Sequence, residues 1–201
     1  MSTGFQERLA NGNAVENAIT VDLQARGVCV KKFGQALLAP DVRDRLKTTQ
    51  SLLRWLPDLA GWQPSKPGMF LIDAKATMRR ATANHSIELR VLLAARFTML
   101  PTFYICDDFR ALAADDIWPD GPILRTCCDG CWEKALADPT GRLLPSKCPE
   151  HARRGGGGSG TPYALVKKLH CRPLESLFGP VMTGAGDRRS TGSTSSDPRG
   201  A

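Results

Sequence analysis

The sequence contains no long hydrophobic run. Its longest apolar stretch, Val91 to Leu100, is interrupted by Arg96 and is far shorter than the roughly 20 residues that a membrane-spanning helix needs. The first residues, MSTGFQERLANGN, lack the basic start and apolar core of a secretory signal. We therefore expect a cytoplasmic protein with no membrane partner.

Several common catalytic patterns are also missing. The sequence has no glycine-rich phosphate loop, no dinucleotide-binding glycine pattern and no set of residues that suggests a Ser–His–Asp or Cys–His nucleophile. It has no internal repeats either. These absences exclude several large enzyme classes and direct attention to acids and to metal ligands.

The chain has 201 residues, of which 42% are hydrophobic and 23% are charged, with a net charge of +7. This length and apolar content suit one domain with an appendage. An excess of positive charge suits an anionic partner such as nucleic acid.

The distribution of apolar residues predicts alternating helices and strands in the first half of the chain. We expect a helix over 14–26, opened by a capping box from Asn13 to Glu16, and further helices over 41–54 and 86–100. Strands are expected over 28–33, 56–59, 69–76 and 102–106. The predicted divisions are a core (1–118), a cysteine-rich segment (119–154), a Gly-rich loop with a short helix or strand (155–178), and a disordered tail (179–201).

Three residues of this core form a chemically suggestive group. Lys75 is the only lysine with an acid two positions before it, and Asp58 follows a proline on the preceding hairpin arm. Residues i and i+2 of a strand point to the same face, so Asp73 and Lys75 should project together, and the hairpin can bring Asp58 beside them. Two adjacent carboxylates favour a cation between them, and oxygen ligands suit Mg²⁺ (or Mn²⁺). A lysine at such a site can orient a water for phosphodiester hydrolysis.

These residues, Pro57-Asp58 and Asp73-Ala74-Lys75, resemble the motif of the PD-(D/E)xK nuclease superfamily. The expected element order over residues 13–106 is similar to the αβββαβ core of that superfamily, which is restriction-endonuclease-like. The resemblance implies that Asp58 and Asp73 bind Mg²⁺ and that Lys75 positions the nucleophile. It also implies that Glu16, on the first helix, can complete the metal site.

Each of these residues has an alternative role. Asp73 and Lys75 could form a surface ion pair on an edge strand, and Asp58 could be a turn aspartate. Glu16 is also the expected acid of the capping box. Weaker candidates for the same region are His85 and Glu88 near the site, with possible phosphate contacts from Lys31, Lys32, Arg79 and Arg80.

A second group, Cys128-x-x-Cys131 followed by Cys148-x-x-His151, has the spacing of a zinc site. Thiolate and imidazole ligands select Zn²⁺ over Mg²⁺, and four protein ligands leave no open position, so this zinc should be structural. Cys127 could replace Cys128, and His170 or Cys171 are less favoured donors. The surrounding segment is basic, with Arg125, Lys134, Arg142, Lys147, Arg153 and Arg154.

Together these features predict an α/β protein that has a restriction-endonuclease-like core and a small zinc-binding appendage. We expect a Mg²⁺-dependent endonuclease that acts on DNA. The alternative is a catalytically inactive zinc-containing protein that binds nucleic acid or serves as an adaptor on the same fold. The sequence does not separate DNA from RNA cleavage, and cutting both strands of a duplex would favour a homodimer.

Overall fold

The computed structural model describes residues 3–49, 51–76, 84–118, 128–154 and 160–182 of the chain. Predictions that concern Arg79, Arg80, Arg125, Cys127 and residues 183–201 of the predicted tail (179–201) lie outside these residues. Among the described helices, none combines the length and the apolar composition needed to cross a membrane.

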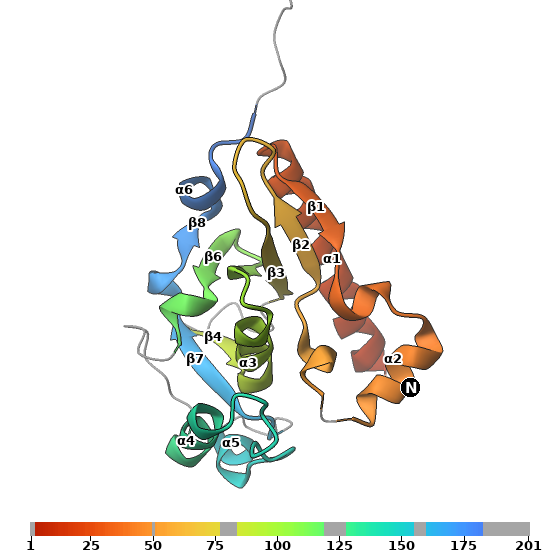
Figure 1. Cartoon of the computed structure of the whole chain (residues 1–201), viewed down its shortest axis with the longest axis vertical. Helices are drawn as coiled ribbons and strands as arrows, with labels where there is room; N and C mark the ends of the chain where they lie inside the picture. The colour runs from red at the N-terminus through yellow and green to blue at the C-terminus, as the bar shows by residue number, and fades with distance from the viewer. Residues whose placement is uncertain (1–2, 50, 77–83, 119–127, 155–159, 183–201) are drawn as a thin grey trace, which may run out of the picture.

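A six-stranded mixed sheet forms the centre of the protein (Figure 1). Its strands, in spatial order, are β1 (Cys29–Lys32), β2 (Leu59–Trp62), β3 (Phe70–Lys75), β5 (Thr102–Cys106), β6 (Arg110–Ala113) and β8 (Arg172–Pro173). Only β3 and β5 pair in parallel; the other neighbours in this sheet are antiparallel. Parallel neighbours need a crossover connection, and α3 (Leu89–Thr98) lies within the connection from β3 to β5. The predicted mixed α/β class is therefore confirmed.

Two hydrophobic clusters lie on opposite faces of this sheet, because successive side chains of a strand alternate. Ile72 and Ile105 pack with Ile19 and Leu23 of α1 (Thr3–Ala25). Tyr104, on the other face of β5, packs with α3. The first helix and the crossover helix thus cover different faces, and we call these the α1 face and the α3 face.

A second sheet of two antiparallel strands, β4 (Asn84–Glu88) and β7 (Tyr163–Lys167), adjoins the α3 face. Ile87 and Val166 belong to the same hydrophobic cluster as α3. The expected helix over 86–100 is therefore wrong at its start. Residues 84–88 alternate between buried and less buried positions, and pairing with β7 holds them extended up to the first helical residue, Leu89.

Two other predicted helices differ from the structure at their ends. The first helix ends as expected beside Gly27, whose φ is +76°, but it begins at Thr3, so Asn13 is interior and forms no capping box. The helix predicted over 41–54 is α2 (Pro40–Lys47) followed by the 3₁₀ helix η2 (Leu52–Trp55). The chain turns between them because the hydroxyls of Thr48 and Thr49 bond back to carbonyls of α2, at 2.7 and 2.8 Å.

The remaining described elements are short. They are the 3₁₀ helices η1 (Gly34–Leu37), η3 (Ala114–Asp116) and η4 (Lys168–His170), and the α-helices α4 (Asp129–Ala137), α5 (Pro149–Arg154) and α6 (Leu174–Phe178). The segment 161–178, for which a helix or a strand was expected, contains both. It supplies a strand to each sheet.

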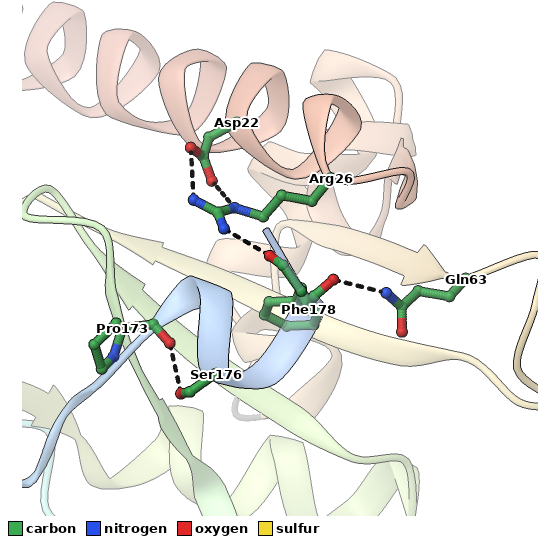
Figure 2. Close-up of polar contacts among 7 residues, drawn as sticks. Asp22, Arg26, Gln63, Pro173, Ser176 and Phe178 are labelled. Atoms are coloured by element: carbon green, nitrogen blue, oxygen red, sulfur yellow. Dashed lines mark hydrogen bonds and ion pairs between the residues drawn. The ribbon is translucent and has the colours of Figure 1, made fainter. Parts of the chain in front are cut away.

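Figure 2 shows how α6 is fastened to the N-terminal half of the chain. Arg26 at the end of α1 forms an ion pair with Asp22 at 2.7 Å and donates a hydrogen bond to the carbonyl of Gly179 at 2.7 Å. Gln63, just after β2, donates to the carbonyl of Phe178 at 3.0 Å. The Phe178 ring packs against Phe70 and Phe103, with ring centroids 5.2 and 5.3 Å away. α6 therefore packs on the α1 face of the sheet, next to the end of α1.

Candidate functional site

Asp58 and Asp73 face one another on neighbouring strands. In the β2–β3 ladder Leu59 lies opposite Ile72, so continuing the register by one residue places Asp58 opposite Asp73. The two carboxyl groups are close enough to share a hydrogen bond, and the backbone N–H of Ala74 also donates to Asp58. The strand expected over 56–59 is shifted, since β2 begins just after Asp58.

Lys75 joins this pair on the same face of β3, as the two-residue spacing predicted. Its Nζ lies 2.7 Å from Oδ2 of Asp73. Asp73 is only 5% exposed, and β3 lies between β2 and β5. The alternative of a surface ion pair on an edge strand is therefore wrong.

The electrostatics of the pair reflect two carboxyl groups held together. Burial, and then the charge and hydrogen bond of Asp73, raise the pKa of Asp58 to about 7, although Lys75 and the N–H of Ala74 act in the opposite direction. Burial lowers the pKa of Lys75, but Asp73, Asp58 and Glu88 outweigh it, and the net pKa is raised. Without a metal, Asp58 is therefore partly protonated near neutral pH and Lys75 is charged.

We call Asp58, Asp73 and Lys75 the acid–lysine group. Two further residues border it. Glu88 lies at the junction of β4 and α3. Burial and Asp73 raise its pKa and Lys75 lowers it, and the net pKa is raised. Its Oε2 is buried without a hydrogen-bond partner among the described residues. Tyr104 lies opposite Asp73 in the parallel ladder, and burial, with a smaller effect of Asp73, raises the pKa of its phenol. Glu88 was only a weak candidate from sequence, and Tyr104 was not predicted, because its place beside Asp73 depends on the parallel pairing of β3 and β5.

Glu16 lies on the α1 side of the sheet, opposite the face that carries Asp73. It forms an ion pair with Lys32 at the end of β1. Asp58 lies at the same end of the sheet as Lys32, because the N–H of Phe33, the residue after Lys32, donates to the Asp58 carbonyl at 2.8 Å. The role of Glu16 as a metal ligand stays a prediction. Of the two expected phosphate contacts on β1, Lys31 is exposed and Lys32 is engaged by Glu16.

The second predicted group is assembled as a compact cluster, which we call the Cys₃His cluster. One ligand atom from each of four buried residues lies within 4.8 Å of the others; these are Cys128, Cys131, Cys148 and His151. Cys128 Sγ is 3.6 Å from Cys148 Sγ and 3.8 Å from Nδ1 of His151. Zn–S and Zn–N bonds of about 2.3 and 2.0 Å in a tetrahedron separate ligand atoms by roughly 3.5–3.8 Å. The cluster thus has the donors and spacing to hold a metal ion such as zinc.

Each pair of ligands is positioned by the first turn of a short helix. The carbonyl of Cys128 accepts from the N–H groups of Cys131 and Trp132 at the start of α4, at 3.1 and 3.2 Å. The carbonyl of Cys148 accepts from Ala152 in α5 at 3.0 Å. Residues three apart on a helical turn share a face, so both pairs point into one centre.

The Cys148 thiol is held in a form suited to metal binding. Burial raises its pKa, but hydrogen bonds from His151, from Cys128 and from the backbone of Glu150 outweigh this and lower the pKa to about 6. Burial raises the pKa of Cys128 and Cys131. The cluster also packs against the core, because Cys128, Cys131, Cys148 and Trp132 belong to the hydrophobic cluster of α3.

The other proposed donors lie elsewhere. Cys171 is buried near Cys106, and its carbonyl accepts two hydrogen bonds from Arg110. His170 lies beside it, at the end of η4. Cys106 is buried, whereas Cys29 is half-buried. The described cysteines are all free thiols.

The chain matches no protein-family model, and no curated protein is significantly similar to it.

Proposed function

We propose that the protein is a Mg²⁺- or Mn²⁺-dependent endonuclease that hydrolyses phosphodiester bonds in DNA, on a restriction-endonuclease-like core. The pairing of Asp58 with Asp73 beside Lys75 is the observation that carries the proposal. Burial, followed by the charge and hydrogen bond of the facing Asp73 carboxyl group, raises the pKa of Asp58 to about 7, and a divalent cation between the two groups would relieve their repulsion. Their oxygen atoms are the ligand type that Mg²⁺ prefers.

The topology supports the same proposal. The chain follows the order α1, then the antiparallel strands β1, β2 and β3, then α3 and the parallel strand β5. This order corresponds to the αβββαβ core that the motif implies. The strands β4, β6, β7 and β8 are additions to it.

Each residue of the acid–lysine group has a role in the proposed reaction. Asp58 and Asp73 would hold the cation, which when bound lowers the pKa of water and stabilises charge on a phosphate. Lys75 would orient the attacking water and offset the charge that develops on phosphate oxygens. Glu88, whose charge acts on Lys75, would restrict or orient the incoming water.

The charge of the surroundings supports an anionic substrate. A cavity of about 150 Å³ is lined by Arg54, Trp55 and Arg90, with Thr49, Ser146 and Thr161. The guanidinium groups of Arg54 and Arg90 lie 4.9 and 5.9 Å from the Trp55 ring centroid, and both influence the charge of Glu88. Exposed basic residues continue over the cysteine-rich segment, namely Lys134, Arg142, Lys147 and Arg153. These groups would contact the phosphate backbone on either side of the scissile bond.

The test is cleavage of a panel of linear, branched and single-stranded DNAs, with RNA versions alongside, in Mg²⁺, Mn²⁺ or EDTA. We expect metal-dependent cleavage that Asp73→Asn abolishes while DNA binding survives. Asp44→Asn is a matched control, because Asp44 also forms a 2.7 Å ion pair with a lysine but on the exposed surface of α2.

Cleavage that is unchanged in Asp73→Asn would refute the assigned site. Binding of DNA without cleavage of any substrate would favour the alternative, a catalytically inactive nucleic-acid-binding or adaptor protein. Cleavage of RNA alone would keep the site and change the substrate.

A further inference from the structure

A third group of potential metal ligands lies on the α3 face, apart from both groups above. His85 of β4, Cys106 at the end of β5 and Asp108 in the following turn each place one ligand atom within 4.8 Å of the others. His85 and Cys106 are buried, and Asp108 is exposed. Neither the acid–lysine group nor the Cys₃His cluster uses these residues.

His85 has an unused ligand atom in a buried position. Its side chain is only 5% exposed, and its Nε2 has no hydrogen-bond partner in the described part of the chain. A buried polar nitrogen without a partner is unfavourable, and a bound metal ion would satisfy it. Burial also lowers the pKa of the ring, which keeps the imidazole in the neutral form that binds metals.

The turn after β5 brings Asp108 back towards Cys106. The N–H of Phe109 donates to the carbonyl of Cys106 at 3.0 Å, and Phe109 has a φ of +57°. Oδ1 of Asp108 accepts from the N–H of Arg110 at 3.2 Å. The carboxylate is thus oriented by its own turn, with its second oxygen left for another contact.

We propose that His85, Cys106 and Asp108 bind a transition-metal ion of the zinc class, with a fourth coordination position open to water or substrate. Thiolate and imidazole donors select Zn²⁺ over Mg²⁺. Three protein ligands with one open position distinguish zinc sites that act on ligands from closed structural sites. The proposed metal binding does not depend on the nuclease function.

This third group adjoins the acid–lysine group. Cys106 lies opposite Lys75 in the parallel ladder, and neighbouring strands are about 4.8 Å apart. The N–H of Asp107 donates to the Lys75 carbonyl at 3.2 Å. A phosphate held near Lys75 would therefore lie within reach of the open position.

Cys171 is the residue that could close the site. It is buried, and its nearness to Cys106 adds to the effect of burial, which is the main cause of the raised pKa of the Cys106 thiol. The proposal assigns it to the core rather than to the metal. A Cys171→Ser variant distinguishes a site with Cys171 as fourth ligand from a site whose fourth position is open.

The test is the zinc content of the full-length chain, measured by mass spectrometry after dialysis against Zn²⁺ and then against metal-free buffer. We expect two zinc ions per chain in the parent and one in His85→Asn and in Asp108→Asn. Asp108 lies at an exposed turn, so its asparagine variant should fold even if the His85 variant does not. His170→Asn and Asp44→Asn are matched controls that should keep two ions.

A second measurement follows the thiolate directly. Cobalt titration of the metal-free chain should give a thiolate-to-cobalt absorption band with two steps, of which one is missing in Cys106→Ser. Retention of both ions in His85→Asn, Asp108→Asn and Cys106→Ser would overturn the site. Loss of the second ion in Cys171→Ser would overturn the open fourth position.

Discussion

Lys75 Nζ lies 2.7 Å from Oδ2 of Asp73, and both side chains project from an interior strand of the sheet. The lysine is therefore fixed by the same carboxylate that would hold the cation. Two substitutions can separate the catalytic role of Lys75 from its role in neutralising the carboxylates, because one removes its charge and the other keeps the charge but changes the donor geometry.

We predict that Lys75→Ala lowers cleavage by at least about 100-fold, the lower range for loss of a proton-transfer or charge-stabilising group. DNA binding should survive in Lys75→Ala. Lys75→Arg keeps the charge but alters the donor geometry, so it should restore little activity. Single-turnover cleavage rates measure both effects. Lys47→Ala removes an equivalent exposed ion pair and should leave the rate unchanged; equal losses in this control would contradict the assignment.

Stability should depend on pH through Asp58. Its pKa is about 7 in the folded chain against an ordinary 3.8, so the folded state holds a proton that the unfolded state releases above pH 4. The stability that this proton supplies is full below pH 4 and is lost as the pH rises to 7. Because the side chain is partly exposed, we expect a loss of about 1–3 kcal/mol.

Thermal unfolding in EDTA at pH 4 to 8 tests this expectation. The difference between the parent and Asp58→Asn isolates Asp58 from Glu88, whose pKa is also raised, and from Lys75. Mg²⁺ should stabilise the parent at pH 8 and have little effect at pH 5, where the proton competes with it. Parallel pH profiles of the two proteins would count against the raised pKa.

We predict that the Cys₃His cluster binds zinc and that removal of this ion unfolds α4 and α5. Zinc binding in small zinc peptides supplies on the order of 10 kcal/mol of folding energy. Strong chelation should therefore expose residues 128–154 to protease, as should the double variant Cys128→Ser and Cys131→Ser. Hydrogen exchange in α1 and β1 should change little, because these elements belong to the other hydrophobic cluster. Uniform loss of protection throughout the chain would show that zinc supports the whole fold.

Tyr104→Phe should stabilise the protein or leave its stability unchanged. The Tyr104 hydroxyl is buried without a hydrogen-bond partner among the described residues, and such a group costs about 1–3 kcal/mol. Chemical denaturation measures the free energy of unfolding. Tyr163→Phe, at a half-buried ring on β7, is the control. A loss of more than about 1 kcal/mol in Tyr104→Phe would indicate a hydrogen bond that the structure lacks.

Arg26→Ala should detach α6 from α1. The Arg26 side chain is 11% exposed, and its guanidinium group bonds both Asp22 and the Gly179 carbonyl. Hydrogen bonds of charged groups contribute about 1.5–3 kcal/mol, so we expect a loss of this size. Increased hydrogen exchange confined to residues 174–179 would identify the contact, whereas Arg26→Lys should keep part of it.

The site residues that could be placed from sequence are those whose partners are close in the chain or lie across one hairpin. The acid–lysine spacing and the two zinc-ligand pairs depend on strand alternation and helical turns, which local sequence specifies. Glu88 and Tyr104 could not be placed in this way, because their positions require the parallel β3–β5 pairing and the β4–β7 pairing. The latter joins residues about eighty positions apart and converts 84–88 from expected helix to strand. The early start of α1 was missed because its first ten residues are mostly polar or glycine, with Phe5 and Leu9 as the only large apolar residues.

The short strand β8 has a consequence for self-association. It contributes only Arg172 and Pro173 to the outer edge of the six-stranded sheet, and proline has no N–H to donate to a further strand. The opposite edge, β1, carries the exposed lysines Lys31 and Lys32, and lysines on an edge discourage strand addition. Both margins of this sheet thus resist growth by backbone pairing. Fibre-like polymerisation through this sheet is therefore disfavoured, and two copies that cut opposite strands of a duplex would meet through other surfaces.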